Sequence, residues 1–398
     1  MKICVLFDNF GPYHLARLSA LSERCHVLPM EISGRSLEYR WGHTERHPLE
    51  RTTLLREEEP GSVSPALIQA RLLECLDGLR PDVIAVPGWF ELASLAAIRW
   101  ARAARVPVIM MSDSTRHDER RYLHKEFIKR RIVGMCSGAM VGGIFHAAYM
   151  RELGMASSRI VDGYDVVDND HFARGARVAR DDADSKRKEF QLPGEYFLAS
   201  SRWLPRKNLL RLIAAWDLYR GREQVADPWP LVILGYGEGE PELRAEIARR
   251  GLGQWVTLAG FQPYDRLPVY YGLAGAFIHP ALSEPWGLVV NEAMAAGLVP
   301  IVSSTAGCAP DLVTDGQTGF QFQPTDIAQL CAIMTRVSTD HDLRRRIARQ
   351  AEDRIRGWSP TRFATNLVSV AETALHSENK STPLLARACL EALLLRAS

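Results

Sequence analysis

One stretch of the sequence, residues 276–307, constrains the fold more than any other. It runs AFIHPALSEPWGLVVNEAMAAGLVPIVSSTAG. Residues 276–279 are a short apolar run before a proline, and residues 299–303 are a second run with β-branched side chains; both patterns are typical of buried strands. Helix-forming residues at 287–296 lie between them, and Gly297 follows where a left-handed residue would end a helix. Two short strands joined by a helix predict a parallel crossover unit, whose ligands bind at the carboxyl ends of the strands.

The loop between the first of these strands and the helix has the groups that a sugar-diphosphate site needs. Backbone N–H groups of Gly287, Leu288 and Val289 would point out of the helix N-terminus, where a phosphate is favoured, and glycine lets it approach closely. Glu284 and Glu292 lie eight residues apart, and an ionised carboxylate can hold two neighbouring hydroxyls. One carboxylate at each end of a diphosphate suits a sugar and a ribose. The alternative is that both are ordinary surface charges.

Residues 284–297, EPWGLVVNEAMAAG, resemble the signature of the GT-B retaining glycosyltransferases of family 4. That signature is a glutamate, seven residues and a second glutamate, commonly as E-P-x-G-x-x-x-x-E-A-x-A-x-G. The resemblance covers most of the chain and is strongest over residues 196–324. It implies that Glu284 contacts the donor sugar and Glu292 the ribose, with Pro285 among the donor-binding residues.

Composition limits the class of protein further. At 398 residues the chain can form two domains, and 46% hydrophobic with 24% charged residues is ordinary for a globular protein. A net charge of +2 gives no reason to expect a nucleic-acid partner. Seven scattered cysteines without a C-x-x-C pair argue against zinc and favour buried free thiols in a reducing compartment. There is neither a signal-peptide pattern nor an apolar run of about 20 residues, so we expect a cytoplasmic protein.

Strand-like and helical segments alternate twice along the chain, which predicts an α/β protein with two doubly wound Rossmann-like domains facing across a cleft. The resemblance implies that this is the GT-B fold. We expect an acceptor-side domain at residues 1–172 and a donor-binding domain at residues 187–372. One option is that helices within about 373–398 pack back on the first domain. The charged residues 172–191 are interpreted as the linker with a helical start to the second domain, and residues 35–60 as a loop-rich stretch.

Four residues of the first half are candidates for the site. Its first loop lacks the G-x-G-x-x-G fingerprint of dinucleotide binding. In related glycosyltransferases this loop faces the donor, which makes Gly11 a donor-binding candidate and His14 a sugar or acceptor candidate. In many relatives a histidine in a later loop contacts the donor sugar, but here the nearest candidates are Asp113 and His117. The alternatives are a structural histidine at 14 and a turn that caps the next helix at 113.

The second half supplies two cations and two glycine turns. Arg202 and Lys207 follow its first strand directly and match the cations that the family uses on the donor diphosphate; Arg grips a phosphate with a planar fork and Lys as a point charge. The alternative is an ordinary surface loop. Gly235 begins a glycine-rich turn that can approach a ligand, although such clusters mark loops in general. Gly260 and Phe261 lie where relatives place the nucleotide base.

A basic segment at residues 116–131 has seven Lys or Arg against three Asp or Glu, interleaved with Tyr122, Leu123, Phe127 and Ile128. Such a segment can lie on an anionic membrane surface or hold an anionic acceptor. A protein of this kind would be peripheral at the inner face of the membrane. The other interpretation is a helix whose charged face lies in solvent while a stripe of apolar side chains packs on the core.

The predicted reaction is transfer of a hexosyl group from a nucleotide-diphosphate sugar to the hydroxyl of a small molecule, an oligosaccharide or a lipid-linked sugar. The products would be glycans, glycolipids or glycosylated metabolites. Resemblance implies retention of configuration, with Arg202, Lys207 and Glu284 as catalytic residues and the leaving phosphate taking the acceptor proton. Fixed cations would neutralise the diphosphate, so neither a metal nor another cofactor is expected. The alternatives are another GT-B enzyme, such as a sugar-nucleotide epimerase or phosphorylase, and a non-catalytic nucleotide-sugar binder.

Overall fold

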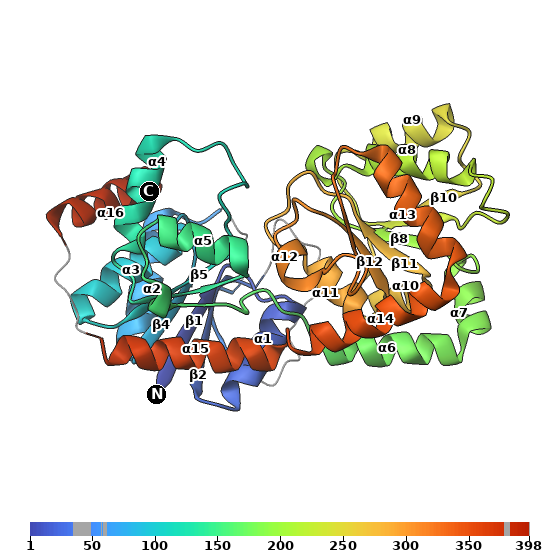
Figure 1. Ribbon diagram of the computed structural model, residues 1–398. Helices are drawn as coiled ribbons and strands as arrows, with labels where there is room; N and C mark the ends of the chain where they lie inside the picture. Colours follow the sequence, from blue (N-terminus) through green and yellow to red (C-terminus); the bar gives the residue numbers. More distant parts are fainter. Residues whose placement is uncertain (35–48, 57, 59–61, 378–382, 398) are drawn as a thin grey trace. The chain divides into compact units, whose positions relative to one another are not determined.

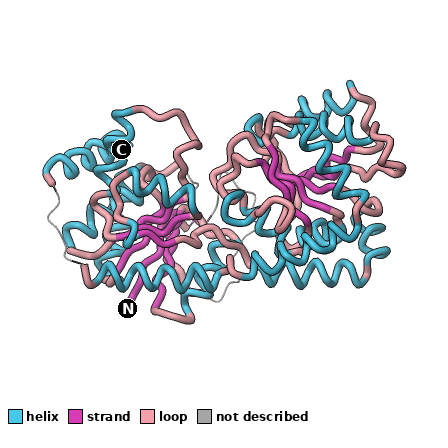
Figure 2. Tube along the Cα trace, in the orientation of Figure 1, coloured by secondary structure: helices cyan, strands magenta, loops and turns pink. Residues whose placement is uncertain are grey.

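The computed structural model describes residues 1–34, 49–56, 58, 62–377 and 383–397. The chain forms two compact units. Unit 1 combines Met1–Val166 with Pro360–Ser398, and unit 2 is Val167–Ser359. In each unit a wholly parallel sheet lies between layers of helices (Figures 1 and 2), as the predicted α/β architecture requires.

The sheet of unit 1 has seven strands in the order β3-β2-β1-β4-β5-β6-β7. Its inner strand β1 is buried on both faces, with Ile3, Val5 and Phe7 on one and Cys4 and Leu6 on the other. An apolar run of this kind is what a strand covered on both faces needs. The strands are β1 Lys2–Phe7, β2 His26–Ser33, β3 Thr52–Leu55, β4 Val83–Pro87, β5 Val108–Ser112, β6 Gly138–Val141 and β7 Ile160–Val161.

Helices from both ends of the chain cover this sheet. The helices of unit 1 are α1 Pro12–Ser22, α2 Pro65–Leu79, α3 Leu92–Ala104, α4 Leu123–Val133, α5 Ile144–Glu152, α15 Pro360–Leu375 and α16 Leu384–Ala397, with the 3-10 helix η1 Ser157–Arg159. α15 packs against α1 and along β5, β6 and β7. The Arg362 guanidinium pairs with the Asp162 carboxylate at 2.8 Å, which attaches α15 to the loop after β7. α16 contacts α3 and α4, so the C-terminal segment completes the first unit.

The sheet of unit 2 has six strands in the order β10-β9-β8-β11-β12-β13. The strands are β8 Phe197–Ser200, β9 Leu231–Leu234, β10 Val256–Gly260, β11 Ala276–His279, β12 Val299–Ser303 and β13 Phe320–Phe322. The sheet grows outward in both directions from the neighbouring strands β8 and β11. Loops at the carboxyl ends of two such strands diverge and leave a crevice, the usual ligand position in an open α/β sheet.

The helices of unit 2 lie on both faces of its sheet. They are α6 Asn169–Asp181, α7 Ala183–Phe190, α8 Leu209–Arg220, α9 Glu240–Arg249, α10 Leu267–Leu273, α11 Leu288–Ala295, α12 Ala309–Leu312, α13 Ile327–Thr339 and α14 His341–Arg356, with the 3-10 helix η2 Pro205–Lys207. α8, α9 and α13 bury apolar side chains against one face of the sheet. α6 packs on α10 and α11, and α11 packs on α14.

The units and the predicted domain spans differ at two places. Much of the stretch interpreted as a linker is α6 and α7, inside unit 2. Phe172, Ala176 and Ala179 form one buried face of α6, spaced four and three residues apart. Gly175 allows α6 to approach α10, because a Cβ there would lie 2.5 Å from Cβ of Pro268. The second difference is α15, which belongs to unit 1 although its residues 360–372 were assigned to the second domain.

Three strands were not predicted. β2 has a proline and a glutamate in its middle, β3 lies in a stretch interpreted as a loop, and β13 has three residues. Of the predicted loop-rich stretch, residues 35–48, 57, 59 and 60 lie outside the described residues.

All seven cysteines are free, and four of them are buried. No helix in the described part of the chain is both long and apolar enough to cross a membrane.

Candidate functional site

Two loops meet at the carboxyl ends of β8 and β11, and backbone hydrogen bonds hold them together. η2 follows β8 and ends at Lys207, after which Asn208 takes a left-handed φ of 62°. The Asn208 side-chain amide donates to the carbonyl oxygens of Pro280, at 2.9 Å, and Pro324, at 2.7 Å. The Leu282 N–H donates to a carbonyl of the η2 loop at 2.8 Å. These bonds bring Lys207 beside the loop that follows β11.

A buried charge cluster lies at this meeting point. The Lys207 ammonium forms an ion pair with Oε2 of Glu284, and Nε2 of His279 lies 3.2 Å from the same oxygen. The side chains of Lys207 and Glu284 are only 10% and 12% exposed. Burial works to raise the pKa of Glu284, but His279 and the Lys207 charge outweigh it and lower that pKa to about 2. Glu284 is therefore an ionised acceptor at every physiological pH.

His279 was not singled out from the sequence. It ends β11, which is otherwise apolar, and its side chain is buried. A polar residue that closes a buried strand at its carboxyl end is a usable signal, since ligands bind at that edge. A single histidine at the end of a strand belongs to no motif with a defined spacing, so the sequence alone did not indicate a role for it.

Gly287 starts α11 directly above the cluster. Its φ of 102° is one that side chains rarely adopt, and an added Cβ would lie 3.3 Å from both Glu284 Cγ and His279 Nε2. In the part of the chain that the structure describes, the N–H groups of Gly287, Leu288 and Val289 donate to no backbone carbonyl. Three open N–H groups at a helix N-terminus suit an anion. This start of α11 thus supplies the positive edge that the sequence predicted there.

The segment between the two glutamates is firmly anchored. Glu284 forms a parallel bridge with Ala306 after β12. The Trp286 indole N–H donates to Asn291 at 2.9 Å, and its ring stacks on Trp358 with centroids 5.6 Å apart. Pro285, half-buried, lies between these anchors. A loop fixed at both ends can hold a carboxylate in position without a ligand.

Glu292 lies inside α11 with 1% of its surface exposed. The Tyr271 hydroxyl donates to its Oε2 at 2.6 Å. An ionised carboxylate has room for about four hydrogen bonds, so a ribose hydroxyl and Tyr271 can share it. Burial raises the pKa of Tyr264, and the negative charge of Glu292 adds to that shift.

The glycine turn after β9 packs on the loop that carries Arg202. Gly235 has a φ of 129°, and a Cβ there would lie 1.8 Å from the Ser201 carbonyl oxygen. A Cβ at Gly237 would lie 2.5 Å from the Trp203 carbonyl oxygen. The close approach that glycine permits here is therefore to the chain itself. Arg202 is half-buried between these contacts, five residues before the lysine of the cluster.

Gly260 ends β10, and Phe261 follows it on the same edge of the sheet. The Gly260 carbonyl accepts from the Gly235 N–H at 2.9 Å, which joins the two turns. Phe261 is half-buried and meets Tyr236 edge-on, with ring centroids 5.7 Å apart. These two rings form an aromatic surface of the kind on which a base can lie.

In unit 1, His14 has a structural role of its own. The Gly11 N–H donates to His14 Nδ1 at 3.0 Å, at the start of α1, and the His14 ring lies 4.3 Å from the ring of Phe7. Burial, with help from the charge of Arg17, lowers the pKa of His14 to about 3. The same bond starts α5, where the Gly143 N–H donates to a histidine three residues on.

Asp113 and His117 are exposed in the loop after β5. The loop is held by Thr115, whose hydroxyl donates to Asp118 Oδ1 at 2.7 Å. The His117 ring meets Phe145 edge-on at 6.1 Å. The structure thus places His14 in a helix start and the other two candidates on an exposed loop of the same unit.

Among the described residues, no three His, Cys, Asp or Glu side chains gather closely enough to hold a metal ion. Two aspartates one residue apart, Asp168 and Asp170, are a spacing that metal-using glycosyltransferases employ, but here the Asp168 side chain accepts from the His171 N–H at 3.0 Å as the N-cap of α6. The absence of a metal requirement stays a prediction.

Residues 181–354 match the family described as "Glycosyl transferases group 1". Over 129 residues the chain is 32% identical to the O-antigen chain mannosyltransferase B of Escherichia coli, which covers 32% of each protein. Over 120 residues it is 31% identical to the alpha-D-kanosaminyltransferase of Streptomyces kanamyceticus, covering 30% of this chain and 31% of that protein. The chain matches about a third of the length of these curated relatives.

Solved structures are similar over nearly the whole chain. HepE of Anabaena, in complex with UDP and glucose, has a TM-score of 0.72 at 18% identity, covering 93% of this chain and 98% of that one. Sucrose-phosphate synthase of Thermosynechococcus elongatus has a TM-score of 0.67 at 17% identity, covering 100% of both. Such low identities establish the fold alone. The chain has the two-domain GT-B fold, and its residues 181–354 match the glycosyl transferases group 1 family.

Proposed function

We propose that this protein transfers a hexosyl group from a nucleotide-diphosphate sugar to an acceptor hydroxyl, with retention of anomeric configuration. The observation that carries the proposal is the buried cluster of Lys207, Glu284 and His279 beneath the open N-terminus of α11. It combines a fixed acceptor for sugar hydroxyls with donors for a diphosphate. The match of residues 181–354 to the glycosyl transferases group 1 family supports the same reaction class.

Charge balance assigns different roles to the cations. Without a donor, Lys207 and Glu284 neutralise each other, so the net attraction for a diphosphate comes from Arg202 and the α11 N-terminus. When the donor binds, the Lys207 ammonium can donate to a phosphate oxygen while Glu284 accepts from sugar hydroxyls. Both side chains are already buried and fixed, so little reorganisation is needed as charge develops.

In the proposed reaction the bond from the anomeric carbon to the diphosphate breaks, and a bond to the acceptor oxygen forms on the same face of the ring. The acceptor hydroxyl gives its proton to the departing phosphate oxygen. No side-chain base or nucleophile is then required, and the chain's contribution is positioning and charge stabilisation. Gly11, His14, Asp113 and His117 remain the proposed contacts from unit 1.

The donor and acceptor are best identified by a screen. Purified protein is given nucleotide-diphosphate sugars, with a UDP-sugar first because HepE was solved with UDP and glucose. Nucleoside diphosphate release is measured with and without monosaccharide, oligosaccharide and lipid-linked acceptors. We expect release that depends on the acceptor, and proton NMR of the product should show the anomeric configuration of the donor.

Other outcomes identify the alternatives. An altered nucleotide sugar without any acceptor would indicate an epimerase, and turnover that requires inorganic phosphate would indicate a phosphorylase. Tight binding without turnover on any acceptor would indicate a nucleotide-sugar binder. An inverted product would contradict retention while leaving glycosyl transfer in place.

The fixed cations lead us to propose that the reaction needs no metal ion. Activity measured after exhaustive treatment with EDTA should equal that of the untreated protein. Loss of activity that magnesium or manganese restores would contradict this part of the proposal.

A further inference from the structure

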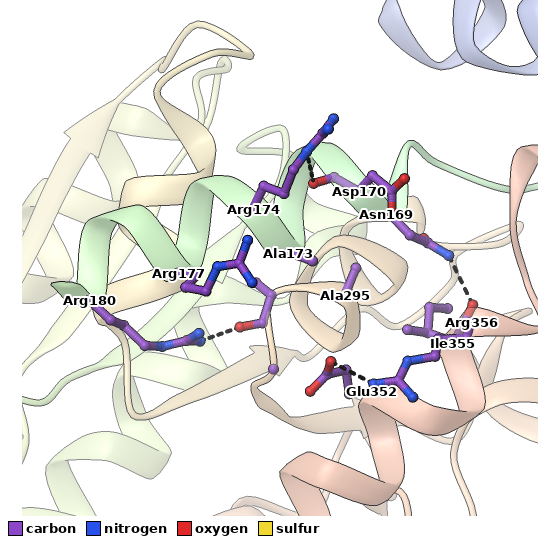
Figure 3. A pocket seen from close by; sticks show the side chains of 12 residues that line it. Asn169, Asp170, Ala173, Arg174, Arg177, Arg180, Ala295, Glu352, Ile355 and Arg356 are labelled. Atoms are coloured by element: carbon purple, nitrogen blue, oxygen red, sulfur yellow. Dashed lines mark hydrogen bonds and ion pairs between the residues drawn. The ribbon is translucent and has the colours of Figure 1, made fainter.

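Unit 2 contains a polar pocket away from the candidate site, and none of its lining residues belongs to that site. Its volume is roughly 440 Å³, its four arginines are exposed, and it lies among α6, the end of α11 and the last turn of α14 (Figure 3). Its charged lining residues are four arginines and two carboxylates, namely Arg174, Arg177, Arg180, Arg356, Asp170 and Glu352. The lining therefore has an excess of positive charge.

The three arginines of α6 lie on one face of that helix. Arg174, Arg177 and Arg180 are spaced three residues apart, and side chains with this spacing are neighbours on a helix surface. α6 packs against α11, and α11 packs against α14. The arginine face of α6 therefore borders a space whose far side is Arg356 of α14 (Figure 3).

Three of the arginines already have partners. Arg180 donates to the Ala296 carbonyl oxygen at the end of α11, where the helix dipole favours a cation. Arg356 pairs with Glu352 at 3.0 Å and with Asp353 at 2.9 Å. Arg174 Nε donates to the Asp170 carbonyl oxygen at 3.3 Å, which leaves its terminal nitrogens outside that bond.

Arg177 is different from these three. Among the described residues, its guanidinium makes no hydrogen bond or ion pair, although it lines the pocket and lies between the other two arginines of α6 (Figure 3). A guanidinium presents five N–H donors in a planar fork that matches a phosphate. Arg177, with Arg174 one turn away, is thus the pocket's open anion-binding group.

Asn169 supplies an acceptor at the other end of the same pocket. Its amide nitrogen donates to the Ile355 carbonyl at 3.0 Å and the Trp358 carbonyl at 3.1 Å. Two carbonyl partners fix which end of the amide is nitrogen. Oδ1 is then the acceptor end; it is buried, and it has no hydrogen-bond partner in the described part of the chain. A buried acceptor without a donor costs stability that a ligand hydroxyl could recover.

From these contacts we infer that the pocket binds a small phosphorylated polyol or sugar, with its phosphate on Arg177 and Arg174 and a hydroxyl on Asn169. The position of the pocket within unit 2 predicts that such a ligand also stabilises the fold. Asn169 is the third residue of unit 2, and Trp358 lies one residue before unit 2 ends. A ligand that joins the start of α6 to the end of α14 stabilises both of these segments.

The test is calorimetric titration of the full chain with glucose 6-phosphate and glycerol 3-phosphate, with glucose and glycerol as uncharged counterparts. A saturating nucleoside diphosphate occupies the donor site throughout. We expect the two phosphate esters to bind, the uncharged compounds to fail, and Arg177→Gln to weaken binding roughly tenfold or more, as loss of a hydrogen bond to a charged group does.

A matched control separates this pocket from general charge effects. Arg345→Gln changes another exposed arginine, on α14 but outside the pocket, and should bind as the wild type does. Lys207→Ala should also bind the phosphate esters normally, because it alters only the donor site. Equal weakening by both arginine variants, or no binding at millimolar ester, would each overturn the inference, whether or not the protein transfers a sugar.

Discussion

Both units contain a buried glutamate near the carboxyl edge of their sheet, and the two are held in opposite ways. In unit 1, Glu31 on β2 is 1% exposed and accepts from the Phe10 N–H and the Thr53 hydroxyl, each at 2.8 Å. Burial raises its pKa in spite of these bonds and of Arg51 at 3.5 Å. In unit 2, Glu284 has its pKa lowered to about 2, although burial opposes this, because His279 and Lys207 act on it.

The two pKa values shift in opposite directions because the glutamates have different partners, and not because one is more buried than the other. Glu31 accepts from two neutral donors at 2.8 Å and has the Arg51 cation at 3.5 Å. These contacts tie together the loop after β1 and strands β2 and β3, which is a structural task. Glu284 has a buried ammonium ion as partner, and a buried pair of this kind gains little stability over an apolar pair. Buried charge that contributes little to stability is a common mark of a functional site. We therefore propose a chemical role for Glu284 at the edge of unit 2 and a structural role for Glu31.

The largest effect that we predict tests this assignment directly. Lys207→Ala and Glu284→Gln should each lower kcat by on the order of a hundredfold or more with a smaller change in KM, because both act on charge that develops in the transition state. Arg202→Ala should behave likewise. Steady-state kinetics with the donor found in the screen provides the measurement.

Two controls match these variants. Arg206→Ala removes the exposed cation next to Lys207, and Glu31→Gln removes the buried carboxylate of unit 1. Both should leave kcat within a few-fold of the wild type. A loss in Glu31→Gln as large as that in Glu284→Gln, with both proteins folded, would remove the distinction between the two edges.

A second, smaller effect concerns the ribose. Glu292→Ala should weaken nucleoside diphosphate binding by roughly 1.5–3 kcal/mol, the contribution of a hydrogen bond to a charged group. Tyr271→Phe removes the observed partner of Glu292 and leaves the carboxylate, so it should weaken binding less. Unchanged affinity of Glu292→Ala in titration calorimetry would contradict the ribose assignment.

The pH dependence of the free energy of unfolding provides the third test, which concerns His14 in unit 1. His14 has a pKa of about 3 instead of 6.5, so the folded state keeps it neutral while the unfolded state takes up a proton. Its stabilising contribution is present above pH 6.5 and is lost as the pH falls towards 3. The slope is at most about 1.4 kcal/mol per pH unit. In urea unfolding at several pH values, His14→Gln should flatten this dependence, whereas the exposed His124→Gln should not. An unchanged slope in His14→Gln would mean that His14 is charged in the fold.

Much of the fold could be predicted because a parallel sheet buries both faces of its strands. β11 and β12 are short apolar runs with a helix between them, and no other element fits such a pattern at that length. β2 was not predicted, because Pro29 and Glu31 interrupt its apolar run. Only the folded structure shows that this glutamate accepts a hydrogen bond from the Phe10 N–H. α6 looked like a linker because its outer surface is charged, while its buried face rests on Phe172 and two alanines.

The candidate site was predictable only where one short segment carries the information. Glu284, Gly287 and Glu292 lie within nine residues and match a motif. Asn208 matters through contacts between loops far apart in the sequence, since it reaches the carbonyl of Pro280 and, 116 residues on, that of Pro324. His279 contacts Glu284 only five residues on, but it does so through the turn of the folded loop. No spacing rule encodes such contacts. His14 shows the converse, since its helix-start bond to Gly11 is local and also occurs at Gly143, in a position with no predicted function.

The smallest effect that we predict is binding of unit 1 to anionic lipid. α4 presents exposed apolar side chains at its start, with Leu123 92% exposed and Phe127 42%. Several cations of the 116–131 segment are engaged within the fold, since Lys129 and Arg121 both lie near Glu126. Lys125 and Arg130 remain exposed. Attraction of about 1 kcal/mol per basic residue near the surface then gives weak, reversible binding that salt should remove.

Co-sedimentation with anionic and neutral vesicles at low and high salt measures this. The wild type should bind anionic vesicles at low salt only. The double variant Lys125→Glu with Arg130→Glu should not bind, whereas Lys188→Glu with Arg345→Glu, the same charge change on exposed residues of unit 2, should bind normally. Equal loss in both double variants would mean that overall charge, and not α4, attracts the lipid. A wild type that ignores anionic vesicles at low salt would make a water-soluble acceptor the better choice, because α4 would then be a solvated helix with an apolar tip.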